Sequence, residues 1–271
     1  MKTHVNDLSG ETIRRGLRTE QLGRSLHYYA VCGSTNDVAL DLLARGAPHG
    51  TLVVCDGQTQ GRGQRGRGWH SPRGLSIHAS LVLRGESGVA PPTLLVAAVG
   101  LGLAEGLEAV TGAALGIKWP NDLWSGGRKL AGILVEARGF SPAAPAFVAG
   151  FGVNVNHRAE DFPPELRESA TSLALLTGRR HDRAVVLRGV LESLEPRILQ
   201  SLTGTGTAEM QDAYRRRSVL LGQRVRLLDA DAPIEGVVTD LSATDGLLLR
   251  TDDGRHRHVL AEHARDVRPA G

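Results

Sequence analysis

Residues 57–74 carry the densest group of side chains that could do chemistry. They read GQTQGRGQRGRGWHSPRG, in which four arginines (Arg62, Arg65, Arg67 and Arg73) surround a single Trp69. Glycines let backbone N–H groups turn toward a ligand, and arginines donate charge-assisted hydrogen bonds to phosphate or carboxylate groups. Loops of this length without structure of their own are usually functional or disordered. We therefore predict a lid that becomes ordered over a bound anion.

Composition alone leaves two other interpretations of this loop open. A flexible Arg/Gly segment can bind RNA, usually together with aromatic residues on which bases stack. A GxGxxG pattern matches at Gly61, Gly63 and Gly66, but no helix pattern follows it, and the GxxxxGK[ST] motif of P-loop enzymes is absent. The loop by itself therefore indicates an anionic ligand without identifying it.

A second polar group, Ser34-Thr35-Asn36, stands at the predicted start of a helix. Two hydroxyls and an amide beside a helix N-terminus can hold a polar, uncharged ring through hydrogen bonds. The simpler interpretation is that Ser34 is an N-cap and that a polar first turn follows it.

Lysines and an acid recur at predicted strand ends. Lys118 and Asp122 flank a Trp-Pro-Asn turn, and a cation beside an acidic oxygen suits a nucleotide with its Mg²⁺, which prefers oxygen ligands. Lys129 begins an apolar strand, from which it could reach a carboxylate or an α-phosphate in a cleft. The alternatives are an ordinary strand and turn for the first block and a solvated edge lysine for the second.

The elements that must position these groups alternate between strands and helices, which predicts an α/β fold. A short helix and turn are expected within 11–23, and a long loop at 56–74. Periodicity, caps and turn residues predict the rest. Further helices are expected at 35–45, from Pro91 and Pro92 to 110, at 182–200 and at 207–221; strands are expected at 51–55, 75–83, 115–119, 130–138 and 146–153, with a turn-rich link at 121–128.

The pattern changes after Gly222. Short predicted strands at 224–228, 234–241, 247–251 and 256–260 are separated by turn signals such as Asp245-Gly246 and Asp253-Gly254. We therefore predict a catalytic domain over residues 1–221 and a small β-barrel over residues 222–271.

Composition fits an ordinary globular protein and sets limits on its class. The chain has 271 residues, and 32 basic residues against 29 acidic ones give a net charge of only +3, which does not require nucleic acid as a partner. Two cysteines make no disulfide framework. The N-terminal residues have no apolar core, so we expect no signal peptide, and the apolar run Thr93–Ala104 is too short to span a bilayer. We expect a cytoplasmic protein without a membrane anchor.

Taken together, the blocks resemble those of biotin protein ligases. The loop resembles the family's GRGRRGRxWxSP signature and departs from it at Gln64, where the common pattern has an arginine that is associated with holding the reactive intermediate. The other similar blocks, in the family's order, are Ser34-Thr35-Asn36, Lys118–Asp122, Lys129–Glu136, Gly150–Asn156 and Thr171-Ser172-Leu173. The resemblance implies an SH2-like mixed-sheet core and an SH3-like C-terminal barrel.

The resemblance also implies the ligands and the residues that hold them. ATP, Mg²⁺ and biotin are the expected small molecules, and Lys129, Arg62 and Asp122 are the expected catalytic residues, with Asp122 also the Mg²⁺ ligand. The expected biotin-binding residues are Ser34, Thr35, Asn36, Gln58, Gly61, Arg62, Lys129 and Gly132, and the expected nucleotide-binding residues are Arg65, Arg67, Trp69, Lys118, Asn121, Asn154 and Arg268.

The implied reaction has two steps, formation of biotinyl-5′-AMP and transfer of biotin to a lysine of a biotin carboxyl carrier domain. Because both reactants of the first step are anions, catalysis by positioning and charge is expected, without a protein nucleophile. Lipoate protein ligase is the nearest alternative enzyme, and an RNA-binding protein is the alternative from another class. Since little chain precedes Ser34, we expect no sequence-specific DNA binding; a homodimer is left open.

Overall fold

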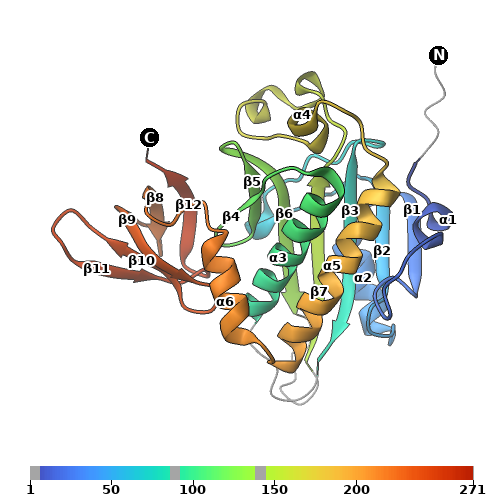
Figure 1. The fold of residues 1–271 in the computed structure, drawn as a ribbon, viewed down its shortest axis with the longest axis horizontal. Coiled ribbons are helices and arrows are strands. Elements are labelled where there is room, and N and C mark those ends of the chain that lie inside the picture. Colours follow the sequence, from blue (N-terminus) through green and yellow to red (C-terminus); the bar gives the residue numbers. More distant parts are fainter. Residues whose placement is uncertain (1–6, 86–91, 138–144, 271) are drawn as a thin grey trace.

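The computed structural model describes residues 7–85, 92–137 and 145–270. A seven-stranded mixed sheet forms the larger part, and a five-stranded antiparallel sheet forms the C-terminal part beside it (Figure 1). In spatial order the large sheet consists of β1 (Leu26–Cys32), β2 (Leu52–Gln58), β3 (Ser76–Arg84), β7 (Ala146–Asn154), β6 (Arg128–Ala137), β5 (Asp122–Ser125) and β4 (Gly116–Lys118). Among the strand pairs of this sheet in the described residues, β1 and β2 alone are parallel.

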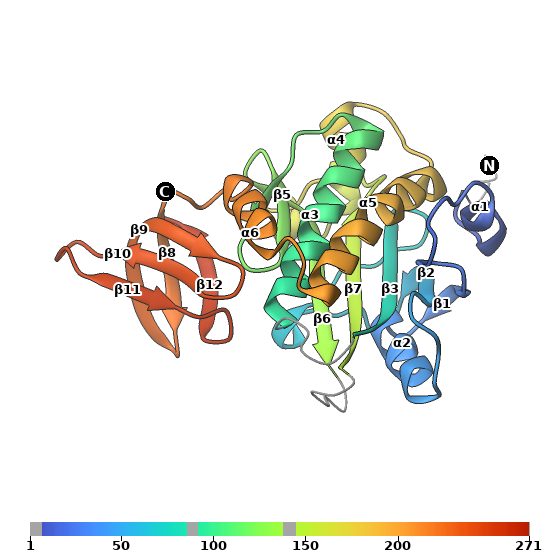
Figure 2. The same ribbon diagram turned by 60° about the horizontal axis from the view of Figure 1, so that its bottom comes forward.

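Helices cover both faces of this sheet. Successive side chains of a strand point to opposite faces, so Leu52 and Val54 belong to the main core while Val53 joins a second cluster under a helix on the other side. The main core is covered by α3 (Pro92–Thr111) and α5 (Arg183–Thr203), which lie side by side in Figures 1 and 2, and the second cluster by α2 (Thr35–Ala44).

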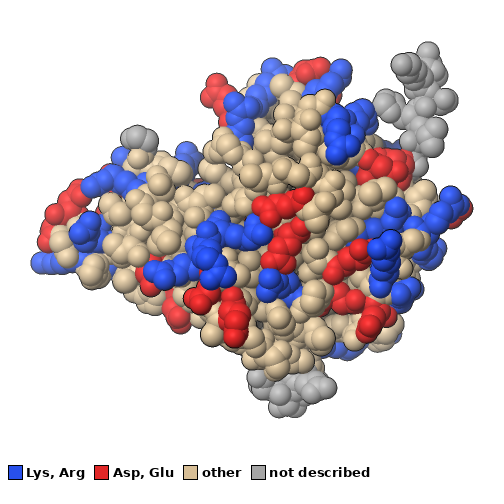
Figure 3. Space-filling view, in the orientation of Figure 1, with Lys and Arg blue, Asp and Glu red and all other residues tan. Residues whose placement is uncertain are grey.

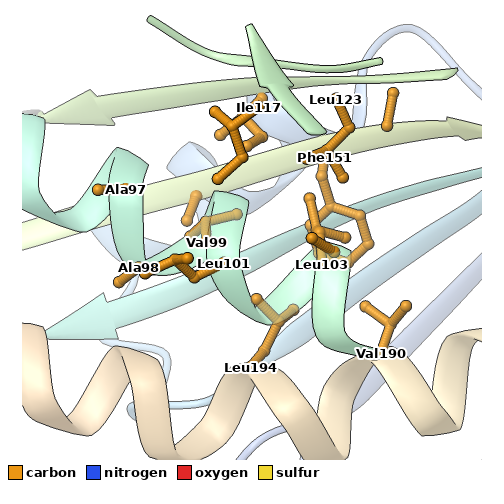
Figure 4. Packing of buried hydrophobic residues seen from close by; sticks show 14 of the residues in the cluster. Ala97, Ala98, Val99, Leu101, Leu103, Ile117, Leu123, Phe151, Val190 and Leu194 are labelled. Carbon is orange, nitrogen blue, oxygen red and sulfur yellow. The ribbon is translucent and has the colours of Figure 1, made fainter. Parts of the chain in front are cut away.

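The contact between α3 and α5 depends on two glycines. A Cβ on Gly102 would lie 2.8 Å from the Leu194 Cα, and one on Gly106 would lie 2.6 Å from the Val190 Cα. The two helices therefore approach backbone to backbone, and apolar side chains of α3, of α5 and of the sheet strands pack in one core cluster (Figure 4). By length and composition α3 could cross a membrane. Its burial between α5 and the sheet explains the same apolarity.

The sheet face under α2 has an apolar half and a polar half. Val82 and Val148 pack under the helix. Farther along β3, on the same face, come Ser80, His78 and Ser76, all buried. The neighbouring strands β6 and β7 contribute glycines to this face, at positions 132, 150 and 152. Small and polar residues thus leave this half of the face open to a ligand.

The segment that connects the last helix to the C-terminal part runs along the β4 edge of the large sheet. After α6 (Thr207–Arg216), Ile117 of β4 donates to the Arg217 carbonyl (2.8 Å), and its own carbonyl accepts from the Val219 N–H (3.0 Å). This connector, residues 217–219, therefore covers the β4 edge. The C-terminal β domain follows, with β8 (Arg224–Asp229), β9 (Ala232–Ser242), β10 (Gly246–Arg250), β11 (His256–Val259) and β12 (Ala264–Pro269).

The predicted α/β class and the C-terminal β domain are confirmed, and so are the main helices and the predicted strands. The expected division at residue 222 stays a prediction. Several elements were missed. They are β1, β5, which lies inside the predicted turn-rich link, β12, α4 (Leu173–Thr177) and three short 3-10 helices at 64–66, 159–161 and 164–166, whereas the short helix expected within 11–23 is present as α1 (Gly10–Arg14).

Two expectations about helix ends need correction. The helix predicted for 207–221 ends at Arg216, because residues 217–219 are drawn into hydrogen bonds with β4. Ser34 occupies the N-cap position of α2 as predicted, but its hydroxyl does not form the capping hydrogen bond. Pro91 and Arg138, at the ends of two predicted elements, lie outside the described residues.

Candidate active site

A hollow opens on the polar half of the α2 face, between the start of α2, the ends of β6 and β7, and the loop that follows β2. It brings together nine of the residues predicted from sequence. These are Ser34, Thr35, Asn36, Gln58, Arg62, Trp69, Asn121, Lys129 and Gly132; Gln64, Ile133, Leu134, Gly150, Phe151 and Gly152 also line it.

The inner wall of this first hollow is a neutral hydrogen-bond network. The Thr35 N–H donates to Gln58 Oε1 (2.8 Å), and the Thr35 hydroxyl accepts from Ser80 Oγ (2.8 Å). Ser80 Oγ also lies 2.6 Å from Asn36 Oδ1. All of these groups except Gln58 are buried, so their positions are fixed before any ligand arrives. Ser80 was missed from the sequence, where it appears only as one residue of a predicted strand.

Glycines on β6 and β7 make room for two large side chains of this site. The Asn36 amide lies where a Cβ on Gly150 would be. The Trp69 indole lies on Gly132 and Gly152, which face each other across the two strands; a Cβ on Gly152 would be 2.6 Å from the Trp69 Cε2 atom. The fit explains why both positions need glycine, a requirement that the sequence alone did not reveal.

Trp69 separates the first hollow from a second one. The second hollow is lined by Arg67, Lys118, Asp122, Lys129 and Asn154, with Trp124, Phe162, Leu166 and Ala170 forming an apolar side. Lys129 reaches both, because its Nζ lies 5.3 Å from the Trp69 ring centre and 2.7 Å from Asp122 Oδ1. One indole thus divides a neutral, polar hollow from a cationic one.

Positive charge is in excess around the second hollow. Lys118 Nζ stands 4.6 Å over the Trp124 ring. Burial lowers the pKa of Lys118; Asp122 opposes that effect, and Lys129, Arg268 and Arg67 add to it. Three cations, Arg67, Lys118 and Lys129, thus line this hollow beside one carboxylate, Asp122. Such a cluster suits a polyphosphate or a carboxylate ligand.

Arg62 is paired with two acids that the sequence did not single out. Its Nη1 lies 2.5 Å from Asp37 Oδ1, and its Nη2 lies 3.1 Å from Glu136 Oε2. The Asp37 hydrogen bond is the largest of the effects that raise the pKa of Arg62. Asn36 Nδ2 also donates to Glu136 (2.6 Å). Asp37 and Glu136 are adjacent to or within motifs seen in the sequence, but nothing in the pattern marked them as partners of the loop.

The tip of the loop, residues 63–67, lies on the C-terminal β domain. Arg65 donates to the carbonyls of Ala261 (3.2 Å) and Glu262 (2.9 Å), and also to that of Ala264. Arg67 forms an ion pair with Asp266. Both arginines were expected at the nucleotide. Besides their contacts with the second domain they line a hollow together with Lys118, Asp122 and Lys129, so the nucleotide contact stays a prediction.

The stem of the loop, Asp56 with Arg73 and Gly74, is held by a buried ion pair. Asp56 Oδ1 accepts from Arg183 Nη1 (2.7 Å) and from the Gly74 N–H (3.1 Å), and Oδ2 accepts from Arg73 Nε (3.2 Å). Burial acts to raise the pKa of Asp56, but these donors, Arg183 first, outweigh it and leave the pKa lowered. One carboxylate therefore joins both ends of the loop to the start of α5.

Two buried histidines lie beneath the stem. His78 and His157 are fully enclosed, and burial lowers the pKa of each to about 4. His157 stacks on Phe162 with ring centres 4.6 Å apart. Within the described residues neither ring nitrogen of His157 has a hydrogen-bond partner, nor does Nε2 of His78. Both side chains are therefore neutral near pH 7.

The remaining predicted residues take supporting positions. Gly61 has no room for a Cβ, which would lie 2.5 Å from Ser71 Oγ. Asn121 Nδ2 donates to the Ile133 carbonyl (2.7 Å), and Asn154 Nδ2 to the Thr171 carbonyl (3.0 Å). Arg268 does not line either hollow and lies in a groove of the β domain.

The residues fit an Mg²⁺ ion that arrives with a nucleotide better than a resident metal centre. Among the described residues no group of three His, Cys, Asp or Glu side chains could hold a metal. Asp122 is the one acidic residue that lines the second hollow. Mg²⁺ commonly takes one or two protein carboxylates and completes its shell with phosphates and water, so Asp122 meets that need.

Comparison with known sequences gives the family. Residues 28–156 match the model of the biotin/lipoate A/B protein ligase family, and residues 220–261 match that of the biotin protein ligase C-terminal domain. The Bacillus spizizenii protein named bifunctional ligase/repressor BirA is 36% identical over 91% of this chain and 76% of its own length. The Mycobacterium tuberculosis biotin--[acetyl-CoA-carboxylase] ligase is 36% identical over 87% of this chain and 88% of its own.

Solved structures agree. The biotin protein ligase from Aquifex aeolicus, in complex with biotin and ATP, superposes with a TM-score of 0.76 at 29% identity, covering 91% of this chain and all of that one. The chain belongs to the biotin protein ligase family.

Proposed function

We propose that the protein activates biotin with ATP to form biotinyl-5′-AMP and then transfers biotin to a lysine of a biotin carboxyl carrier domain. The observation that carries the proposal is the pair of hollows on either side of Trp69, one neutral and hydrogen-bonding, the other cationic. A ligand with an uncharged polar ring and a carboxylate tail fits the first, and a nucleotide fits the second. The names of the relatives support the same reaction.

Biotin would lie in the first hollow. Its ring would meet the hydroxyls and amides there, and its carboxylate would point past Trp69 toward Lys129, where the two hollows meet. At Gly61 and Gly132, beside this path, Ser71 and Trp69 come too close to the backbone for any side chain. The proposed biotin-binding residues are Ser34, Thr35, Asn36, Gln58, Gly61, Arg62, Lys129 and Gly132.

ATP would lie in the second hollow. The base would use the apolar side near Phe162 and Leu166, and the phosphates would meet the cations. The proposed nucleotide-binding residues are Arg67, Trp69, Lys118, Asn121, Asn154 and Arg268, with Arg268 acting from the β domain. Asp122 would hold Mg²⁺, which, when bound, neutralises phosphate charge.

In the first step a biotin carboxylate oxygen attacks the α-phosphorus of ATP, and pyrophosphate leaves. The two anions repel each other, so the chain must supply positive charge that is fixed in place. Lys129 stands at the junction of the hollows, 2.7 Å from Asp122, and would exchange that partner for the reacting oxygens. Arg62 would close the mouth of the first hollow, where Asp37 and Glu136 already hold it.

In the second step the ε-amine of the acceptor lysine attacks the carbonyl carbon of the mixed anhydride, loses a proton, and AMP leaves. A protonated amine is no nucleophile, so a nearby carboxylate helps. Asp122 is the acid at this place and would accept the proton or guide the amine. The loop would keep water from the anhydride during the wait for the acceptor.

Other functions receive less support. A lipoate ligase would share the fold and chemistry, but the neutral network around Thr35 and Gln58 suits a ring that both donates and accepts hydrogen bonds. For RNA binding one would expect a continuous basic surface. On the face that carries α3 and α5, acidic and basic side chains are instead interspersed (Figure 3). The expected lack of sequence-specific DNA binding and the oligomeric state stay predictions.

The deciding experiment is transfer of labelled biotin to a purified biotin carboxyl carrier domain with Mg²⁺-ATP, beside a parallel reaction with lipoate. ATP-dependent labelling by biotin and not by lipoate supports the proposal. Labelling by lipoate alone would keep the chemistry and change the ligand, and no labelling by either would overturn it.

The role of Lys129 can be tested on the first step alone. Lys129→Ala should slow biotinyl-AMP formation by ~100-fold or more, the scale of losing one well-placed charged contact. Arg128→Ala, one residue earlier on β6 and exposed, is the matched control and should leave the rate unchanged. Equal rates for both variants would remove Lys129 from the reaction.

A further inference from the structure

We propose that Arg65 is a positioning residue that locks the tip of the loop to the C-terminal β domain, so that this domain keeps biotinyl-AMP under the loop. The inference rests on the proposed function. It gives Arg65 a different role from the nucleotide contact expected for it, and it makes the β domain part of the lid.

The contacts of Arg65 are those of a latch. Its guanidinium donates to three backbone carbonyls, those of Ala261, Glu262 and Ala264. Ala261 and Glu262 belong to the turn that joins β11 to β12, and Ala264 is the first residue of β12. A guanidinium presents five N–H donors in one rigid plane, which suits several carbonyls at once. Carbonyls are neutral, so the arrangement uses the shape of the side chain more than its charge.

The backbone on both sides of the contact is strained. Arg65 has φ 59° and Asp266 has φ 49°, both in the left-handed region that non-glycine residues seldom adopt. Such residues persist where surrounding contacts hold them, and they cluster at functional sites. The ion pair between Arg67 and Asp266 joins the same two segments. The loop tip and the turn are thus shaped to meet each other.

The loop transmits the position of its tip to the site. Its two arms are held together by backbone hydrogen bonds, from the Gly63 N–H to the Arg67 carbonyl (2.7 Å) and from the Trp69 N–H to the Gly61 carbonyl (2.9 Å). Trp69 follows directly and lies on Gly132 and Gly152 between the two hollows. Holding the tip therefore holds the indole wall behind which the intermediate would sit.

The test compares Arg65→Ala and Arg65→Lys with the unaltered protein. Arg257→Ala, on β11 at the far edge of the β domain sheet, is the matched control. A lysine keeps the charge but cannot reproduce the planar fork. If Arg65 latches the loop through its shape, Lys should behave like Ala; if it served as a charge for phosphate, Lys should restore most of the function.

The first readout needs no substrate. The loop contains trypsin sites at Arg62, Arg65, Arg67 and Arg73; because the variants alter the site at Arg65 itself, cleavage is compared at the other three. Cleavage in a folded protein follows how often the segment opens. Loss of the latch should raise the rate of cleavage at Arg62 and Arg67 by about tenfold, the weight of one or two net hydrogen bonds. Unchanged cleavage in both Arg65 variants, with the fold intact by circular dichroism, would overturn the proposal whatever the protein's activity.

The second readout separates the latch from ligand binding. With biotin and ATP but no acceptor, both Arg65 variants should release biotinyl-AMP into solution severalfold faster while the KM for ATP stays within about twofold, because the latch touches no substrate. A raised KM for ATP without faster release would show a nucleotide contact and contradict the latch. Failure of the proposed function itself would appear differently, as no biotinyl-AMP from any form of the protein.

Discussion

The two ends of the Gly/Arg loop are held by opposite kinds of contact. At the stem, Asp56 and Arg183 form an ion pair that is almost entirely buried, with side chains 5% and 1% exposed. At the tip, Arg67 and Asp266 pair in the open, with side chains 66% and 44% exposed. The same chemistry, a guanidinium on a carboxylate, thus appears in two very different dielectric environments within one loop.

The difference teaches where the loop can open. Separating a buried pair leaves charges without solvent or partner, which is strongly unfavourable, whereas an exposed pair exchanges its partner for water at little cost. The stem is therefore a fixed hinge, and the tip is the part that can lift. A lid of this kind can admit ligands without unfolding the sheet that carries them.

The largest expected effect is at the stem. Arg183→Ala removes the partner of both Asp56 and Asp7 and should lower the free energy of unfolding by about 3–5 kcal/mol, the cost of breaking a buried pair. Arg180→Ala, exposed just before α5, is the control. Chemical denaturation measures both. A loss below about 1 kcal/mol for Arg183→Ala would place the stem in the same class as the tip.

The second largest effect should come from acid, which should lower the free energy of unfolding through the two buried histidines beneath the stem. Unfolded histidines take up protons near pH 6.5, while His78 and His157 resist until about pH 4 in the folded state. Between these values the unfolded state binds more protons, so stability falls as pH falls, by about 2 kcal/mol per histidine from pH 7 to pH 5. Denaturation curves measured across this pH range give the free energy of unfolding. In His78→Asn that free energy should depend less steeply on pH. An equal slope in that variant would exclude His78 as a cause.

The third effect should come from adding a side chain beneath Trp69, in the middle part of the loop. Gly152→Ala would place a Cβ 2.6 Å from the Trp69 indole, and such overpacking typically costs about 1–3 kcal/mol. We expect much of this cost to appear as weaker biotin binding, because the indole can move with the loop. Gly68→Ala is the control, because its new Cβ has open space around it. Calorimetry should find the affinity of this variant for biotin unchanged. Equal affinities would mean that Trp69 is not a wall of the site.

The smallest effect should be at the tip. Asp266→Ala should change the free energy of unfolding by less than about 1 kcal/mol, because the pair is exposed. The ion pair should instead affect how fast trypsin cleaves the loop. This effect should become smaller as salt is added, because salt screens exposed charges. A stability loss as large as that of Arg183→Ala would abolish the contrast between the two ends.

The sequence allowed most of the fold to be predicted wherever a segment carried its own pattern. The strands at 75–83 and 146–153 and the helix after Ser34 are such cases, and all are confirmed. The missed strands depend on partners elsewhere. β12 is rich in charge and ends in Pro269, and β5 begins with a turn-like Asp122, so only pairing with β8 and with β6 makes them strands.

The candidate site also contains residues that the sequence marks and residues that only the fold brings there. The motif residues could be named because their types suggest chemistry, and most of them meet at the two hollows. The residues that hold them could not. Asp37, Glu136 and Arg183 are ordinary charged residues in sequence, and only the fold brings them to Arg62 and Asp56. The docking of Arg65 on the β domain has no local signal, since its acceptors are backbone carbonyls.

The connector at residues 217–219 has a consequence for the loop tip. Because it is hydrogen-bonded along β4, the β domain is not a body on a free tether that must search for its partner. The turn that receives Arg65 is held beside the loop at a high effective concentration, and contacts that would be too weak between separate molecules can then stay formed most of the time. A longer connector would lower the effective concentration of the β domain at the loop without changing any of the residues that form the contact.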